Sequence, residues 1–179
     1  MKKIANLQSA VSKAVILVMS VALVFAIPVN ADPESGDVTV AVGDVQAVTA
    51  NGVSRPLKKG DKVVVGSTVK TGADSRAVIV ITPRSAIRIS ENSEVIIETV
   101  NEDVQPVDVT ISLKDGSLGA LLKPNAADEI DFKVRTPSGV AAARGTFYAV
   151  VVKDGKGYVQ VKEGQVEIIP NDEEADGDQ

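Results

Sequence analysis

Apolar and polar residues alternate with a period of two along several segments of the chain. In residues 107–113 and 130–135 every second side chain is apolar, and Val38, Val40 and Val42 repeat the pattern closer to the N-terminus. Because successive side chains of a strand point to opposite faces, each segment is predicted to be a β-strand with one buried and one solvated face.

A second kind of segment is apolar throughout, and turn residues follow at short intervals. Residues 77–81 read Ala-Val-Ile-Val-Ile, which predicts a strand covered on both faces. The best helical candidate, residues 139–143, is too short for more than one turn. We therefore expect an all-β fold of many short antiparallel strands, arranged as a sandwich or as a solenoid-like stack. The turn signals are Asn51-Gly52, Lys59-Gly60-Asp61, Thr71-Gly72-Ala73-Asp74, Asp115-Gly116, Asp154-Gly155 and Glu163-Gly164.

Two short segments of the chain have similar sequences. Residues 113–118 and 161–166 both run from an apolar residue through Lys, an acid and Gly to a second apolar residue. The pattern predicts two similar hairpins. It does not amount to a repeat, which would need a fixed period over at least three units.

The N-terminus is typical of a secretory signal. Lysines precede an apolar run at residues 14–27, Pro28 interrupts it, and Val29-Asn30-Ala31 offers small residues for a signal peptidase. We expect export to the periplasm or the outside of a Gram-negative-type bacterium, with no stable membrane span after cleavage. The expected organisation is a signal peptide at 1–31, a flexible segment and first strand at 32–42, a β domain at 43–169 and an acidic disordered tail at 170–179.

Composition narrows the chemistry further. The chain has no His, Cys or Trp and a formal net charge of −5, so we expect no metal site, no cofactor, no nucleic-acid partner and no nucleophile–histidine catalysis. Carboxylate pairs remain as candidates for acid–base work on a polysaccharide. The candidates are Glu91 with Glu94, and Asp128 with Glu129 and Asp131. Their alternating or turn-like positions are better explained by a solvated face, so no catalytic residue is expected.

Six further segments form an ordered series: residues 57–63, 66–77, 89–95, 113–118, 134–146 and 161–166. The most specific is Thr136-Pro137 followed by Arg144-Gly145-Thr146. In this order, residues 43–169 resemble the FecR domain, the periplasmic part of transmembrane regulators that control iron-uptake sigma factors. The resemblance implies a β domain that senses a signal or binds a protein.

The chain departs from the family pattern in two respects. Pro83-Arg84-Ser85 stands where the family usually has Asp-Gly-Ser, which changes a turn rather than the fold. A full FecR regulator also has a cytoplasmic anti-sigma segment and a membrane helix before the domain, and a short receptor-contacting domain after it. We therefore expect an exported domain on its own, without the sigma-regulating role.

The expected function is a non-enzymatic protein-binding or sensing module of the cell envelope. Its partner would be another envelope protein or a second copy of the chain. The alternative is a self-assembling structural or surface protein, because strand edges can pair with a neighbour. The five signature residues would either hold the fold together or contact a partner: Thr136, Pro137, Arg144, Gly145 and Thr146. The proline restricts Thr136 to an extended conformation and should end its strand.

Overall fold

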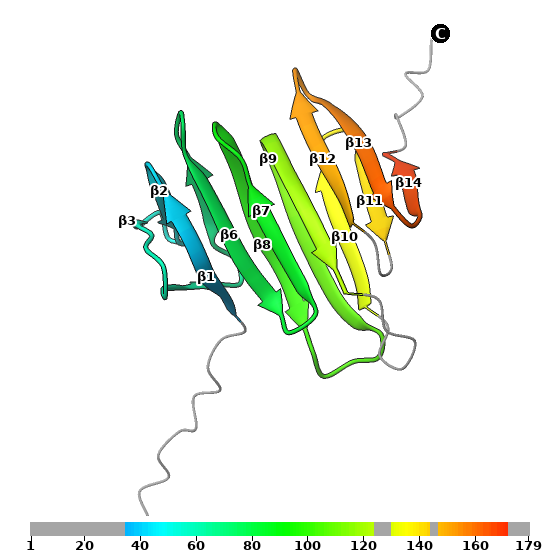
Figure 1. Ribbon diagram of the computed structural model, residues 1–179, viewed down its shortest axis with the longest axis horizontal. Coiled ribbons are helices and arrows are strands. Elements are labelled where there is room, and N and C mark those ends of the chain that lie inside the picture. Colours follow the sequence, from blue (N-terminus) through cyan, green and yellow to red (C-terminus); the bar gives the residue numbers. More distant parts are fainter. Residues whose placement is uncertain (1–34, 124–129, 144–146, 172–179) are drawn as a thin grey trace, which may run out of the picture. The chain divides into compact units, whose positions relative to one another are not determined.

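The computed structural model describes residues 35–123, 130–143 and 147–171 (Figure 1). Every regular element in these ranges is a strand, which confirms the all-β prediction. The first seven strands are β1 (Ser35–Val42), β2 (Val45–Val48), β3 (Ser54–Pro56), β4 (Lys62–Val64), β5 (Thr68–Thr71), β6 (Arg76–Thr82) and β7 (Ser85–Ile89). The others are β8 (Ser93–Asn101), β9 (Val107–Leu122), β10 (Ile130–Thr136), β11 (Gly139–Ala143), β12 (Phe147–Lys153), β13 (Lys156–Glu163) and β14 (Val166–Pro170).

The strands form two sheets that share the long strand β9. The first half of β9 pairs with β8 and β10, and its second half pairs with β7 and β12. Sheet A has the order β4-β1-β6-β7-β9-β12-β13. Sheet B has the order β3-β2-β5-β8-β9-β10-β11-β14. One core lies between them, and Phe132 and Tyr148 are its largest fully buried side chains.

The chain moves back and forth between the two sheets as it proceeds. β1 lies in sheet A, β2 and β3 in sheet B, β4 in sheet A, β5 in sheet B and β6 in sheet A. The layers are therefore those of a sandwich, whereas the path of the chain winds between them as in a solenoid. β9 and β10 pair in parallel, unlike the antiparallel strands expected. The second half of β9 runs through sheet A in the opposite direction to its first half in sheet B. β10 therefore starts in sheet B beside Val107, the first residue of β9, and runs parallel to it.

The two segments of similar sequence are sheet-crossing corners, so the prediction of two similar hairpins is wrong. Residues 113–118 lie inside β9, which passes from sheet B to sheet A at this point. β13 and β14 flank the second segment but lie in different sheets and do not pair with each other. Gly116 and Gly164 have φ values of 86° and 88°, a region that glycine enters without steric cost. The same Lys-acid-Gly motif thus moves the chain to the opposite layer.

Burial follows the predicted alternation in β10, where Phe132 and Val134 are fully buried and the residues between them are more exposed. In β9 the apolar residues Val109 and Ile111 are buried as expected. The solvated face predicted for residues 107–113 is wrong, however, because Thr110 and Ser112 on the other face are also buried.

Two other expectations about strand faces are wrong. A bulge in the pairing of β1 with β6 lies between Val38 and Val40, so Val38 is buried whereas Val42 is exposed. An inserted residue of this kind switches the side chains that follow to the other face. Residues 77–81 are not covered on both faces, because Val78 and Val80 lie on the outer face of sheet A and are only half-buried. Within the described ranges, no helix is long and apolar enough to span a lipid bilayer.

Candidate functional site

The turn between β10 and β11 carries the first two signature residues. Thr136 is the last residue of β10, as expected of a residue before proline. Its hydroxyl donates a hydrogen bond to the carbonyl oxygen of Gly139 at 2.9 Å, across the turn. Pro137 is exposed at the tip. The other three signature residues, Arg144, Gly145 and Thr146, lie outside the described residues.

This turn also joins the last strand of sheet A to the last strand of sheet B. The hydroxyl of Ser138 accepts a hydrogen bond from the backbone N–H of Gly157, the second residue of β13, at 2.7 Å. The carbonyl oxygen of Pro137 accepts one from the Asn171 side-chain nitrogen, just after β14, at 2.9 Å. The turn thus connects the two sheets where each of them ends.

Beyond this connection the two sheets separate at a slot between β13 and β14. Among the described strands, β13 pairs only with β12 and β14 pairs only with β11. On each of the two strands, the side chains that face the core lie beside buried residues of the paired strand. These side chains are Val159 and Val161 on β13 and Val166 and Ile168 on β14. Val161 is 42% exposed and Ile168 is 62% exposed. We call this the β13–β14 slot, an apolar strip between two free strand edges.

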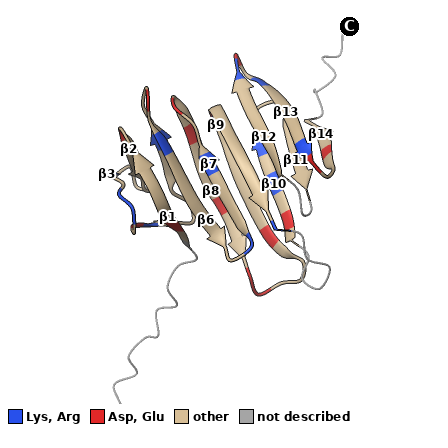
Figure 2. Ribbon diagram, in the orientation of Figure 1, with Lys and Arg blue, Asp and Glu red and all other residues tan. Residues whose placement is uncertain are grey.

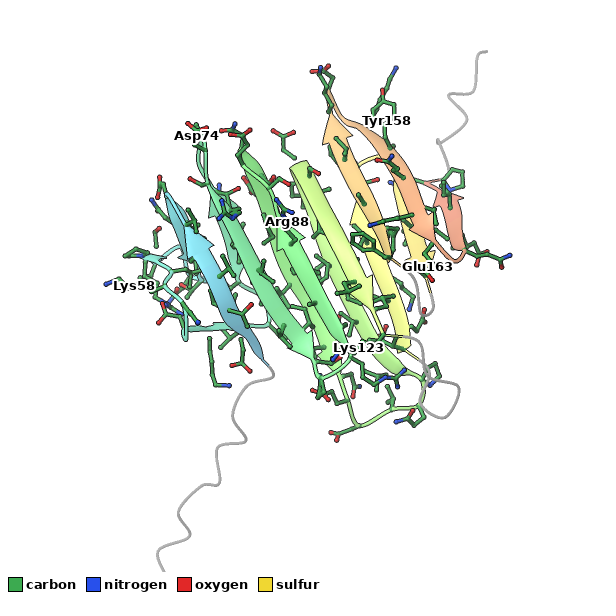
Figure 3. The ribbon with its side chains drawn as sticks, viewed as in Figure 1. Lys58, Asp74, Arg88, Lys123, Tyr158 and Glu163 are labelled. Carbon is green, nitrogen blue, oxygen red and sulfur yellow. The ribbon has the colours of Figure 1, made fainter. Side chains whose placement is uncertain are left out.

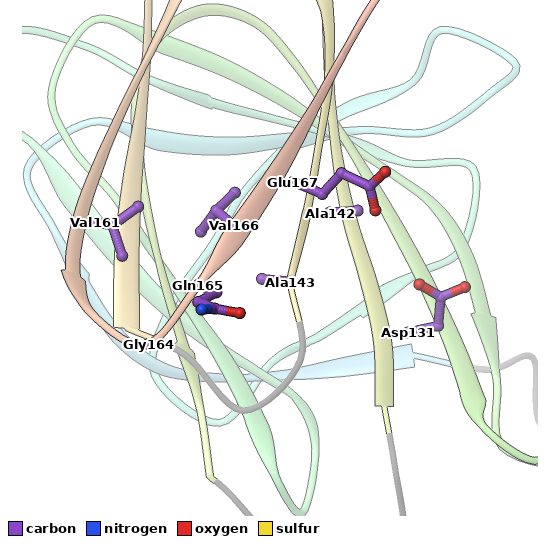
Figure 4. Close-up of a pocket in the computed structure, with 8 residues that line it drawn as sticks. All are labelled: Asp131, Ala142, Ala143, Val161, Gly164, Gln165, Val166 and Glu167. Atoms are coloured by element: carbon purple, nitrogen blue, oxygen red, sulfur yellow. The ribbon is translucent and has the colours of Figure 1, made fainter.

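A hollow of about 720 Å³ continues from the lower part of the slot (Figure 4). Val161 and Val166 lie on its two sides, and Asp131 and Glu167 bring carboxylates to its rim. The remaining lining residues are Ala142, Ala143, Gly164 and Gln165. A smaller hollow of about 120 Å³ is lined by Val159 and Ile168 together with the β10–β11 turn. Apolar walls beside free backbone edges are suited to binding a polypeptide.

The outer face of sheet A is a second apolar surface. A cross-strand row there joins Val80, Ala86, Leu121 and Phe147 on four neighbouring strands. Leu121 is 50% exposed. Figure 2 shows mostly uncharged ribbon across these strands, and Arg88 projects from β7 (Figure 3). Scattered apolar residues are normal on a surface, but a continuous row is typical of contact surfaces.

The outer face of sheet B carries charged pairs instead. The Lys133 ammonium lies 2.7 Å from a carboxylate oxygen of Asp131 and 3.1 Å from one of Asp108. The hydrogen bond to Asp131 is the largest cause of a raised pKa at Lys133, the one to Asp108 acts in the same direction, and partial burial opposes both. Lys70 pairs with Glu94 at 2.8 Å on the same face.

The predicted carboxylate pairs do not converge on a common centre in the described residues. A carboxylate oxygen of Glu91 accepts a hydrogen bond from the backbone N–H of Asp74 at 2.7 Å. Glu94 and Asp131 are engaged by the lysines just described. The described residues also contain no group of three or more acidic side chains arranged to hold a metal ion. Asp128 and Glu129 lie outside the described residues.

Tyr148 and the slot were not found from the sequence. The Tyr148 hydroxyl is buried and has no hydrogen-bond partner among the residues that the structure describes, and burial raises its pKa. The alternation in residues 156–161 indicates a strand. Nothing in the sequence, however, shows which strands end the sheets, because that depends on pairings between distant segments.

Comparison with known proteins identifies the family. Searches of the curated proteins and of the solved structures gave no match. The family model described as FecR protein matches residues 67–167. The match includes both sheet-crossing corners, the β10–β11 turn and all of β13. It confirms the resemblance seen in the sequence, and the chain belongs to the FecR family.

Proposed function

We propose that this FecR-family protein is a sensing module of the cell envelope that works by binding another protein and catalyses no reaction. The β13–β14 slot carries this proposal. It combines exposed apolar side chains, at Val161 and Ile168, with two strand edges that have no neighbour in the described chain. Burying such side chains against a partner is favourable by roughly 25 cal/mol per Å² of apolar surface.

The charged groups of the described residues also favour a binding role. The carboxylates of Glu91 and Glu94 are used in a turn and in a surface ion pair. A retaining or inverting glycosidase needs two carboxyl groups facing each other across a sugar. Ser138, which lines the smaller hollow, accepts a hydrogen bond from the backbone N–H of Gly157 in β13.

Export is the second element of the proposal, and it rests on residues 1–31. The order of lysines, apolar run, Pro28 and small residues before Asp32 is that of a cleaved secretory signal. N-terminal sequencing of the protein recovered from the cell envelope is expected to begin at Asp32. A protein that keeps Met1 and stays in the cytoplasm would contradict this element.

Crosslinking in intact cells tests the binding role. A photocrosslinking amino acid is placed at Val161 in β13, whose side chain faces the slot, and in a control at Lys58, at the opposite end of the sheets (Figure 3). The proposal expects one specific envelope protein to be captured from Val161. If neither position captures a protein other than this chain, the binding role is wrong.

Self-assembly is the second candidate function, and the free edge of β13 is the observation that favours it. Unpaired strands can pair with the same strand of another copy. Sedimentation velocity of the purified protein across a hundredfold concentration range distinguishes the two. A single monomeric species favours the heterologous partner, whereas growing oligomers favour assembly.

A further inference from the structure

We propose that the β13–β14 slot accepts an extended segment of the partner as an additional strand of sheet A, paired with β13. We further propose that this segment carries apolar residues at alternate positions and acidic residues between them. The inference rests on the proposed binding role and specifies its site and its partner chemistry.

The backbone of β13 presents unpaired groups to the slot. Gly157 donates its N–H to Ser138, which lies outside sheet A, so this N–H points away from β12. Backbone groups of every second residue in a strand point the same way. The N–H and C=O groups of Val159 and Val161 therefore face the slot, where the described residues provide no hydrogen-bond partner. An added strand would pair with them.

The edges at the other end of the sheets are far less suited to pairing. Sheet A ends there in β4 and sheet B in β3, and each has three residues. β13 has eight residues. Very short edge strands are one way in which proteins avoid unwanted pairing. The difference in length makes β13 the better template for an added strand.

The side chains of the slot determine one face of the added segment. A strand placed beside β13 would direct every second side chain inward, toward Val159 and Ile168 at one level and toward Val161 and Val166 at the next. Val161 and Ile168 are 42% and 62% exposed in the free protein. Apolar side chains at these positions would cover both, whereas a charged side chain would be desolvated without a partner. The inward-facing residues should therefore be apolar.

Lysines determine the chemistry of the other face. Lys153, Lys156 and Lys162 lie on or beside β13 with exposed side chains. The Lys162 ammonium lies over the ring of Phe147, 5.1 Å from its centroid, on the outer face of sheet A. Asp154 and Glu163 are the acids beside β13 in sheet A, whereas Glu167 of β14 and Asp131 of β10 lie on the outer face of sheet B. This excess of positive charge favours acidic residues on the outward side of the segment.

The same charges disfavour two other occupants of the slot. A second copy of the chain would bring its own three lysines to the shared edge, which sets like charges close together. Residues 172–179 of this chain are acidic, but their one apolar side chain is that of Ala175. They have the charge of the proposed segment without its apolar residues.

A synthetic peptide tests the proposal on the full mature chain. The probe is a blocked seven-residue peptide in which valine alternates with glutamate, and its control replaces each glutamate with lysine. Binding is followed by isothermal titration, and the site is located by amide hydrogen exchange measured by NMR. The acidic peptide is expected to bind at least tenfold more tightly and to slow exchange at Val159 and Val161. Equal affinities, or slowed exchange on other strands alone, would overturn the proposal.

Two neighbouring isoleucines provide a matched pair of variants. Ile168 faces the slot, and Ile169, which is 49% exposed, lies on the outer face of sheet B. I168K should reduce peptide affinity at least tenfold, and I169K should leave it unchanged. V159P adds a backbone test, because it removes a donor that faces the slot and leaves the pairing with β12 in place. Equal effects of I168K and I169K would show that the slot is not the binding site.

The outcomes separate this inference from the proposed function. A partner that crosslinks from Lys58 or from the outer face of sheet A, with the slot unaffected, would leave the binding role standing and refute the inserted strand. Self-association that I168K abolishes would show that a second copy fills the slot, and would also refute it. Failure to capture any other protein refutes the binding role itself.

Discussion

The backbone N–H of Gly157 donates a hydrogen bond of 2.7 Å to the hydroxyl of Ser138. This contact joins the last strand of sheet A to a turn of sheet B, 19 residues earlier in the chain. The hydrogen bond occupies the backbone edge of β13 at Gly157, whereas the edge beyond Gly157 has no partner in the described residues. The family-signature turn therefore sets where the β13–β14 slot begins.

Removal of the Ser138 hydroxyl is expected to loosen this connection. S138A should lower the free energy of unfolding by about 1 kcal/mol, the usual net value of one hydrogen bond, and should speed amide exchange at Gly157. Urea unfolding and NMR exchange measure the two effects. The control is S54A, whose hydroxyl donates to the side chain of Gln46 within sheet B and makes no contact between the sheets. Unchanged exchange at Gly157 would contradict the prediction.

Replacement of Gly116 is expected to disturb the corner of β9. Its φ of 86° costs an L-residue about 1 to 2 kcal/mol, and an added Cβ would lie 2.6 Å from the carbonyl oxygen of Asn92. G116A should therefore destabilise the protein by about 2 to 4 kcal/mol when steric overlap is included. G155A is the matched control, since Gly155 has a φ of 73° but nothing within 4 Å of its added Cβ. If both variants lose the same stability in thermal unfolding, the steric overlap contributes nothing.

Lys133 separates two carboxylates that the parallel pairing places side by side. Asp108 and Asp131 are directly opposite each other on β9 and β10, and Lys133 contacts both. K133M should cost about 0.5 to 1 kcal/mol at pH 7, because the pair is partly solvated and the two acids then repel. Urea unfolding at pH 7 measures the loss, and unchanged stability in K133M would contradict this account.

The raised pKa of Lys133 also predicts how its contribution to the free energy of unfolding changes with pH. The folded state binds this proton more tightly than the unfolded state, so the contribution is complete below pH 10.5, the ordinary value for lysine. It is lost as the pH rises through the higher pKa of the folded state. The stability difference between the wild type and K133M should therefore narrow above pH 10.5. A difference that stays constant to pH 12 would argue against the lysine contacts.

Tyr148 is expected to give a separate alkaline signal. Burial raises the pKa of its hydroxyl, so the folded protein keeps this proton when the unfolded chain has lost it. Stability should fall as the pH rises above 10, and Y148F should remove this part of the pH dependence. In Y158F, which keeps Tyr148 as its one tyrosine, absorbance at 295 nm should show no tyrosinate until the protein unfolds. Tyrosinate formation in the folded variant would disprove the burial effect.

Y148F tests the unpaired hydroxyl at neutral pH as well. The hydroxyl has no hydrogen-bond partner in residues 35–123, 130–143 or 147–171, so its removal deletes a buried polar group without breaking a bond to any of them. We expect equal or slightly higher stability in urea unfolding at pH 7. A loss above about 1 kcal/mol would mean that the hydroxyl has a favourable interaction in solution.

Much of the fold is encoded locally, and that part could be predicted. The period of two in residues 130–135 correctly separates buried from more exposed positions, because side-chain direction alternates within a single strand. In residues 107–113 it finds the buried Val109 and Ile111 but not the burial of Thr110 and Ser112. Thr136 ends its strand because the following proline restricts it locally. The FecR resemblance was likewise readable from short segments in order.

The errors arose wherever the answer depended on distant pairings. Residues 113–118 looked like a hairpin because a Lys-acid-Gly turn can either reverse a strand within one sheet or carry it to another. Pairing with β7 and β12 on one side and with β8 and β10 on the other decided the second outcome. The bulge between Val38 and Val40 likewise arises from pairing with β6.

The sequence by itself determined the strand-rich class, the core-facing residues of the central strands and the positions of the turns, because these follow from short-range sterics and hydrophobic alternation. Only the tertiary structure decided that the strands form two sheets joined through β9, and that β13 and β14 end those sheets with a slot between them. The same holds for the contact of Lys133 with Asp108, 25 residues away. Sheet order and free edges come from long-range pairing, which local residue patterns do not encode.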